Sequence, residues 1–520
     1  QFAQLTSRTF QPGELLNWLN QFGVEVGAPD AWLANVLSVC DRELVASGHE
    51  GGYWIDHWTY IADLLEAFAA IYPDRVGEML AGPRDIPWFD EGAFVRPRAE
   101  KYVIRASGPL QLDAVTTGEP APTPLPAVSM LGKLIALVAV KAVSFDYEGR
   151  GIEMEAGRPG WNDSLNGLPG LFGSSTCEAA ELARLARWLS AHLPADASIE
   201  VPQAVAELIE SAAQDVADAT YNWDRAAGIR ETFRAKAQAN ANAATAKVVH
   251  EVIAKLLTGT ERRGVAALEK ARIDQSPLVH TYYANQPENL SQAASAASAN
   301  NTHDFGAERF TPSPLPLYLE GQVHNLRLQS RPEIARNIHR AVRQSPLYDE
   351  ALRMYKINEC LDACSPEIGR ARTFTRGWFE NESIWLHMSY KYLLELLRAG
   401  LFDEFYADAN TMLVPFMRPE VYGRSILENS SFLASSANPD RASHGRGHIA
   451  RLSGSTAEFI HMWLLLTVGP RPFYLKNGEL RFQLQPALPG TWFTEAAGNI
   501  AWRDENVELP RGAFGCTLLG

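Results

Sequence analysis

The stretch that decides the fold class is STCEAAELARLARWLSAHL, residues 175–193. Its apolar positions recur every three or four residues, which is typical of an amphipathic helix with one buried face. That face is formed by Leu182, Leu185, Leu189 and Leu193. Ser175 and Glu178 have the S-x-x-E spacing of a capping box, so the helix is predicted to begin there. A second such pair, Ser455 and Glu458, predicts the start of another helix.

The rest of the chain repeats this helical pattern with few interruptions. Similar periodicity predicts helices across much of 1–80, 129–143, 175–275, 331–362, 382–399 and 402–413. Strand-like segments begin after residue 470, where Asn477 and Gly478 predict a hairpin turn. Strands and helices do not alternate regularly, which excludes a doubly wound parallel sheet.

We therefore expect a mainly α fold, arranged as an (α/α)6 toroid over residues 1–467. Irregular insertions are expected near 81–128 and 276–320, and a short, truncated C-terminal β-sandwich portion over 468–520. The chain starts with Gln1 rather than Met, and we expect it to be a fragment or a processed product. The sequence does not decide the compartment, with a slight preference for the cytoplasm.

Composition and charge restrict the classes of partner. The 520 residues carry a formal net charge of −14, whereas proteins that bind duplex nucleic acid need a basic surface. No stretch reaches the roughly 20 apolar residues of a membrane-spanning helix, so no membrane partner is expected. The cysteines are five, scattered along the chain, which predicts neither a disulfide framework nor a metal site.

The segment GIEMEAGRPGWNDSLNGLPGLFGSS, residues 151–175, is the main candidate for chemistry. Its glycines and prolines interrupt a helical region, and such loops commonly carry functional groups. Asp163 stands close to Trp161, and partial burial beside an aromatic ring keeps a carboxyl group protonated for general acid catalysis. The alternative is that Asp163 merely caps the following turn.

The Trp-Asn-Asp core of this segment resembles the Asp-Trp-Asn-Asp-x-x-Asn loop of glycoside hydrolase family 94, the cellobiose and chitobiose phosphorylases. The resemblance implies that Asp163 is the catalytic proton donor, and that Arg158, Trp161 and Asn162 lie at the substrate. Gly160 stands where the family has its first Asp, so the positioning of the substrate differs.

Three further segments resemble the family in the same order along the chain. Ser383-Ile384-Trp385-Leu386-His387 implies that His387 binds phosphate, and RLSGSTAEFIHMW, 451–463, is similar to a Thr-Gly-Thr-Ala phosphate segment. The phosphate ligands implied there are Arg451, Gly454, Ser455 and Thr456. In Gly52-Tyr53-Trp54-Ile55-Asp56, Trp54 and Asp56 are implied to hold the sugar, although Ile55 replaces the family's Arg.

The function implied is inverting phosphorolysis of a β-gluco-oligosaccharide, with one carboxylic acid, inorganic phosphate as co-substrate and neither a metal nor an organic cofactor. The alternative is an inverting hydrolase or transglycosylase, which needs a second carboxylate. Glu382 and Glu428, and also Glu155, are the candidates. A non-catalytic glycan-binding domain is the alternative from another class. A homodimer, or association with a missing N-terminal β-sandwich, is the expected assembly.

Overall fold

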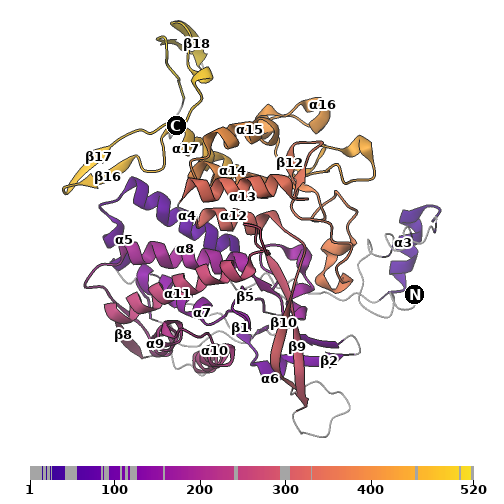
Figure 1. Ribbon diagram of the computed structural model, residues 1–520, viewed down its shortest axis with the longest axis vertical. Helices are drawn as coiled ribbons and strands as arrows, with labels where there is room; N and C mark the ends of the chain where they lie inside the picture. The colour runs from indigo at the N-terminus through magenta and orange to yellow at the C-terminus, as the bar shows by residue number, and fades with distance from the viewer. Residues whose placement is uncertain are drawn as a thin grey trace.

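The chain folds into a mainly helical body with small antiparallel sheets, as expected from its periodicity (Figure 1). The computed structural model describes residues 15, 19, 24, 26–40, 55–82, 86, 93–105, 108–111, 115–117, 126–155, 158–238, 244–292, 305–329, 331–450, 455–502 and 505–516. Among these residues no helix is both long enough and apolar enough to cross a membrane.

The longer helices carry most of the body. Their bounds are α3 (Pro29–Ser38), α4 (Ile55–Ile71), α5 (Val76–Ala81), α7 (Met130–Ala142), α8 (Thr176–His192), α9 (Gln203–Ala217), α10 (Trp223–Gln238), α11 (His250–Ala271), α12 (Leu319–Arg327), α13 (Pro332–Gln344), α14 (Leu386–Arg398), α15 (Phe402–Met412) and α17 (Ser455–Thr467). Helix α4 contacts α8, α8 contacts α12, α12 contacts α14, and α14 contacts α17. The Tyr60 hydroxyl on α4 donates a hydrogen bond to Glu458 on α17, 3.2 Å away, which closes this circuit.

The strands lie mostly at the periphery or at helix starts. The hairpin of β9 (Tyr282–Gln292) and β10 (Phe305–Pro314) projects from the helical body and occupies much of the segment expected to be irregular (Figure 1). Its strand β9 pairs with β6 (Ser174–Ser175), and β6 pairs with β5 (Ile152–Glu153). A second sheet joins β13 (Ile384–Trp385), β14 (Ser430–Leu433) and β15 (Gly447–Ala450), directly before α14 and α17.

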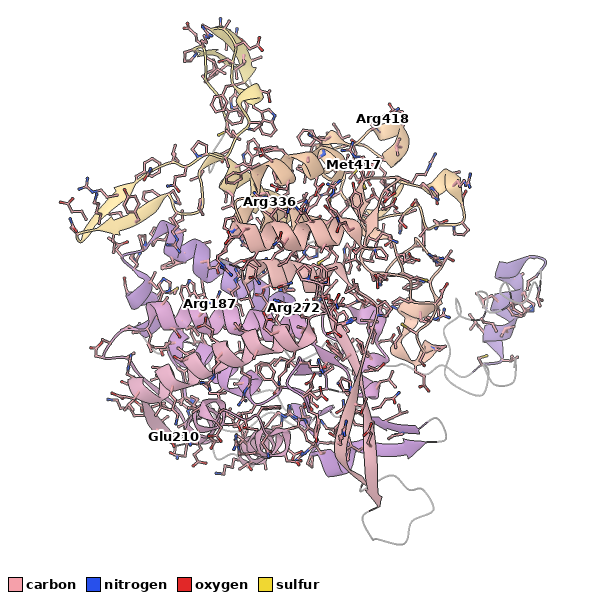
Figure 2. All side chains as sticks on the ribbon, in the orientation of Figure 1. Arg187, Glu210, Arg272, Arg336, Met417 and Arg418 are labelled. Atoms are coloured by element: carbon pink, nitrogen blue, oxygen red, sulfur yellow. The ribbon has the colours of Figure 1, made fainter. Side chains whose placement is uncertain are left out.

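The two largest apolar cores of the described chain are joined by a buried charged layer. One core gathers side chains from helices α4 to α11, and the other from α12 to α17; Figure 2 shows side chains filling the space between the stacked helices. Between the cores, Arg327 pairs with Glu395 at 2.5 Å and with Glu181 at 3.2 Å. Arg184 pairs with Glu181 at 3.0 Å and with Asp63 at 2.5 Å. These ion pairs tie α4, α8, α12 and α14 together.

Two predictions about helix ends are wrong. Helix α8 does begin after Ser175, but the Ser175 side chain accepts no capping hydrogen bond. The Glu178 side chain, the other half of the predicted capping box, pairs with Lys141 at 2.6 Å. Helix α13 ends at Gln344 and does not continue to 362. The reason is Pro346, since the residue before a proline is driven out of the helical region.

The C-terminal segment contains hairpins, as its turn residues predict. Asn477 and Gly478 have φ values of +54° and +80° between β16 (Phe473–Lys476) and β17 (Glu479–Phe482), which confirms the predicted turn. Strands β18 (Gly498–Trp502) and β19 (Glu505–Leu509) pair only with each other among the described strands. The two hairpins thus form separate two-stranded sheets.

Candidate active site

Asp163 is held at the start of a short 3-10 turn, η1 (Asp163–Leu165), which follows Trp161 and Asn162. Its carboxylate lies 2.7 Å from the Arg370 guanidinium, and 42% of the Asp163 side chain is exposed. The backbone N–H of Arg370 donates to the Asn166 side-chain oxygen at 3.0 Å. The loop that carries Asp163 is therefore docked onto the segment around Arg370.

A glycine makes this docking possible. Gly369 has a φ of +129°, and a Cβ atom there would lie 2.6 Å from the Ser164 carbonyl oxygen and 2.6 Å from the Asn166 nitrogen. Any larger residue would push the two loops apart. The site thus depends on a close backbone approach that only glycine permits.

Glu380 lies near enough to Asp163 for the charge of Asp163 to act on it. The sequence analysis did not identify Glu380 as a site residue. Asn358 donates to the Glu380 carbonyl oxygen at 2.7 Å and accepts from the Glu382 N–H at 2.7 Å, which fixes the turn on both sides of Asn381. Phe379 and Glu382 have φ values of +48° and +58°, a conformation that is costly for residues with side chains. Such strain persists where the surroundings enforce it, often at functional sites.

The surroundings of Glu380 favour its neutral form. Its side chain is buried, with 9% exposed, and it makes no ion pair with any residue that the structure describes. Burial, and secondarily the charge of Asp163, raise the pKa of Glu380 to about 7, while Arg370 opposes this effect. The two carboxyl groups therefore differ: Asp163 is ion-paired with Arg370, whereas burial favours the protonated form of Glu380.

A row of aromatic rings runs beside these carboxyl groups. The Trp161 and Trp385 ring centres are 4.5 Å apart, Trp385 and Phe432 are 5.1 Å apart, and Phe432 and His448 are 5.7 Å apart. His448 stacks on Trp378 at 3.7 Å with an interplanar angle of 6°. The three Trp side chains are half-buried, so the row borders solvent in part.

Several buried polar atoms around this row have no hydrogen-bond partner in the described part of the chain. They are the side-chain nitrogen Nδ2 of Asn162, the oxygen Oδ1 of Asn381, the indole nitrogen of Trp385 and the nitrogen Nη1 of Arg158. Asn162 and Asn381 are almost fully buried. A buried polar group without a partner costs about 1–3 kcal/mol, so each of these atoms can gain from a hydrogen bond to water or to a bound molecule.

The indole N–H of Trp161 donates to the buried carboxyl group of Glu320, which also accepts from the Tyr282 hydroxyl. Burial raises the pKa of Glu320. Cys177, Glu320 and His324 lie close enough together to hold a metal ion. The Nδ1 atom of His324 forms a hydrogen bond with the Glu181 carboxyl group, 2.8 Å away. Hydrogen bonds within the described chain thus already account for Glu320, and we assign no metal to it.

His387 on α14 lies next to the first turn of α17, which carries the predicted phosphate residues Ser455 and Thr456. His387 is the second residue of α14, and its Nε2 atom lies 2.8 Å from the Tyr60 hydroxyl and 3.5 Å from Glu458. Although burial opposes it, the hydrogen bond from His387 helps to lower the pKa of Glu458, so a negative charge faces His387. At the start of α17, Ser455 is buried and Thr456 is exposed. Arg451 and Gly454 lie outside the described residues.

The other predicted acids are held by cations. Burial opposes ionisation of Glu382, but hydrogen bonds from Arg376 and Lys356, at 2.5 and 2.8 Å, lower its pKa below the ordinary value. Glu428 is 42% exposed and pairs with Arg424 at 2.7 Å.

Glu155 is likewise paired, with Lys101 at 2.7 Å and Arg234 at 2.8 Å. Asp56 lies in α4, but the structure does not describe its side chain. Trp54 lies outside the described residues.

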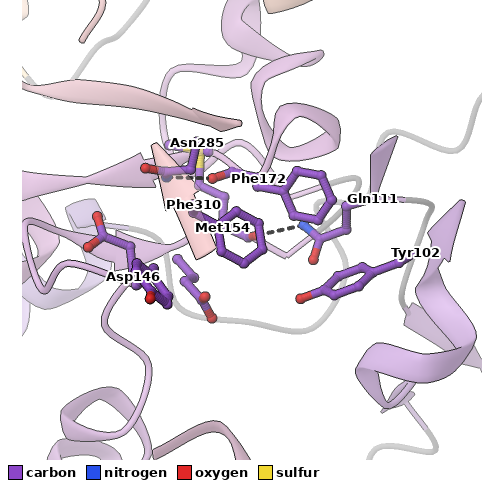
Figure 3. Close-up of a pocket in the computed structure, with 10 residues that line it drawn as sticks. Tyr102, Gln111, Asp146, Met154, Phe172, Asn285 and Phe310 are labelled. Carbon is purple, nitrogen blue, oxygen red and sulfur yellow. Dashed lines mark hydrogen bonds between the residues drawn. The ribbon is translucent and has the colours of Figure 1, made fainter. Parts of the chain in front are cut away.

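A separate, narrow pocket is lined in part by Asn285 of β9 and Phe310 of β10 (Figure 3). Tyr102, Phe172 and Phe310 line it together with two acids, Asp146 and Glu153. Ser174 and two backbone N–H groups donate to Asp146, and Arg230 pairs with Glu153 at 2.6 Å. Burial raises the pKa of Asp146 to about 6. We place the candidate active site at Asp163 and Glu380, because the aromatic row lies there and the sequence motif predicts Asp163.

Comparison with known proteins adds no assignment. No family model matches the chain, and no curated protein matches it significantly. The resemblance to glycoside hydrolase family 94 therefore rests on the four short segments, and it remains a prediction.

Proposed function

We propose that this chain is a carbohydrate-active enzyme that cleaves or forms β-glycosidic bonds with inversion at the anomeric carbon. The observation that supports it best is the pair of unlike carboxyl groups, Asp163 and Glu380, beside a row of aromatic rings. Inverting enzymes of this kind use one carboxylic acid to protonate the glycosidic oxygen. A group with a pKa of about 7 is suited to that task near neutral pH.

The aromatic row favours a sugar as the substrate. Tryptophan faces bind the apolar faces of sugar rings, and the half-buried Trp161, Trp378 and Trp385 offer such surfaces. The unpartnered atoms of Asn162 and Asn381 supply a donor and an acceptor of the kind that sugar hydroxyls satisfy. Aromatic faces together with fixed polar atoms distinguish one hydroxyl configuration from another.

The toroid belongs to the same proposal. The contacts that run from α4 through α8, α12 and α14 to α17, and back to α4, would account for five of the six inner helices of an (α/α)6 toroid. Glu320, His387 and Ser455 stand in the first turns of α12, α14 and α17. A ring of this kind would gather helix N-termini at one end, where the candidate site lies.

Two acceptors are proposed for the cleaved sugar. Phosphate is implied by the resemblance to family 94. Water is favoured by a specific observation, namely a second carboxyl group beside Asp163, because an inverting hydrolase needs both an acid and a base. Neither route requires a metal or an organic cofactor.

The test is incubation of the protein with β-1,2-, β-1,3-, β-1,4- and β-1,6-linked gluco-oligosaccharides, with and without phosphate. Free sugar and sugar 1-phosphate are quantified, and Asp163→Asn serves as the comparison. Product that disappears in Asp163→Asn supports the proposal. Binding of an oligosaccharide without cleavage, unchanged in Asp163→Asn, would instead identify a non-catalytic glycan-binding domain.

A further inference from the structure

Asp163 and Glu380 differ in their partners, and this difference bears on their roles. The Arg370 guanidinium lies 2.7 Å from the Asp163 carboxyl group and forms an ion pair with it. Glu380 has no such cation within the described residues, is 9% exposed and stands in a turn fixed by Asn358. A carboxylate accepts protons, whereas a protonated carboxyl group donates one.

A carboxylate and a cation both lie near His387, where the phosphate is predicted to bind. The Nε2 atom of His387 lies 2.8 Å from the Tyr60 hydroxyl and 3.5 Å from the Glu458 carboxylate, and the positive charge of Lys391 also acts on Glu458. A phosphate beside Glu458 would meet like charge at close range, which costs energy that a neutral water molecule does not incur. Water as the acceptor is favoured by the second carboxyl group near Asp163, because an inverting hydrolase needs both an acid and a base.

We propose that Glu380 is the proton donor and Asp163 is the base that activates water, so that the chain is an inverting glycoside hydrolase. This inference rests on the proposed function, and it assigns to Asp163 the opposite role from the one implied by the family 94 resemblance. Glu382, two residues away in the same Glu380-Asn381-Glu382 run, is excluded as the donor because Arg376 and Lys356 hold it as a carboxylate.

The reaction balances with these two groups and water alone. Asp163 removes a proton from water as the water oxygen bonds to the anomeric carbon. The bond from that carbon to the glycosidic oxygen breaks, and the oxygen takes the proton of Glu380. Afterwards Asp163 loses its proton to solvent and Glu380 gains one from solvent, which restores the starting state.

Leaving-group dependence separates the two roles. The natural oligosaccharide needs a proton on its departing oxygen, whereas 2,4-dinitrophenyl β-glucoside does not. Glu380→Gln is expected to lower kcat on the oligosaccharide by about 10²–10⁴-fold and to change kcat on the dinitrophenyl glucoside less than about 10-fold. Asp163→Asn is expected to lower kcat on both substrates. The matched control is Glu367→Gln, an exposed position on the neighbouring turn, which is expected to leave both rates unchanged.

Further readouts distinguish failure of this inference from failure of the proposed function. In H2(18)O, the released sugar is expected to carry the label at its anomeric carbon. Azide is expected to restore the activity of Asp163→Ala, with the α-glycosyl azide as the product.

The reverse pattern, in which Asp163→Asn retains its activity on the dinitrophenyl glucoside, overturns the assignment of roles. Phosphate-dependent formation of sugar 1-phosphate overturns the inference that the chain is a hydrolase, but it leaves the proposed function in place. A wild-type protein inert on every substrate overturns the proposed function itself, and circular dichroism of each variant excludes misfolding as the cause.

Discussion

Replacement of Glu380 by Gln should change how the stability of the protein depends on pH. In the folded chain the pKa of Glu380 is raised from the ordinary 4.5 to about 7, by burial first and by Asp163 second, with Arg370 acting in the opposite direction. Between these two pH values the unfolded chain has released the proton and the folded chain still holds it. Stability is therefore lost as the pH rises from 4.5 to 7.

The size of this loss follows from the two pKa values. At about 1.36 kcal/mol per pH unit, the span from 4.5 to about 7 corresponds to roughly 3 kcal/mol. Gln remains neutral throughout, so Glu380→Gln does not lose this energy. The variant is expected to gain stability relative to the wild type as the pH rises from 5 to 8.

Thermal unfolding of both proteins between pH 4 and 9 is the assay. Relative to the wild type, the Tm of Glu380→Gln is expected to rise by a few degrees across the window from 4.5 to 7 and to level off above it. Glu382→Gln is the comparison, because the pKa of Glu382 is lowered and its ion pairs stabilise the protein above pH 4.5. That variant is expected to be less stable than the wild type at pH 7, with the difference shrinking in acid. A Tm difference for Glu380→Gln that stays flat from pH 4 to 9 would refute the reasoning.

Three further changes test other parts of the account. Gly369→Ala places a Cβ atom 2.6 Å from the Asn166 nitrogen, and we expect about 1–3 kcal/mol of destabilisation together with lower kcat/KM; an active, equally stable variant contradicts this. Arg327→Met leaves the buried Glu395 charge without this partner, so urea unfolding is expected to show a loss of about 3–5 kcal/mol, and an unchanged midpoint argues against the charged layer. Trp378→Ala removes one aromatic platform, and initial-rate kinetics are expected to show KM raised by about 10-fold with kcat less affected, rather than the reverse.

The mainly helical class of the fold could be predicted from the sequence, because the periodicity of apolar residues follows the buried face of each helix. The stripe that begins at Leu182 lies in α8, and the hairpin at Asn477-Gly478 forms as its turn residues predict. Capping was less predictable: the Glu178 side chain pairs with Lys141, on a helix distant in sequence. Tertiary ion pairs of this kind leave no local trace in the sequence.

Part of the candidate site was also predictable. Asp163 and Trp161 stood out because a glycine-rich loop interrupts a helical region, but their partners Arg370 and Glu320 come from distant segments. Glu380 lies only two residues before the predicted Glu382. Nothing in the sequence indicates that Glu382 meets two cations whereas Glu380 is buried beside Asp163, since that difference arises from a turn held by contacts across the chain.

The most direct test of the central claim is the anomeric configuration of the first product. Proton NMR spectra recorded within minutes of adding the protein to a susceptible β-linked gluco-oligosaccharide resolve the newly formed anomer before mutarotation. Inversion predicts that the α-anomer, as free sugar or as the 1-phosphate, accumulates first and that Asp163→Asn abolishes it. Initial accumulation of the β-anomer would contradict the account, because it requires a retaining mechanism with a carboxylate nucleophile.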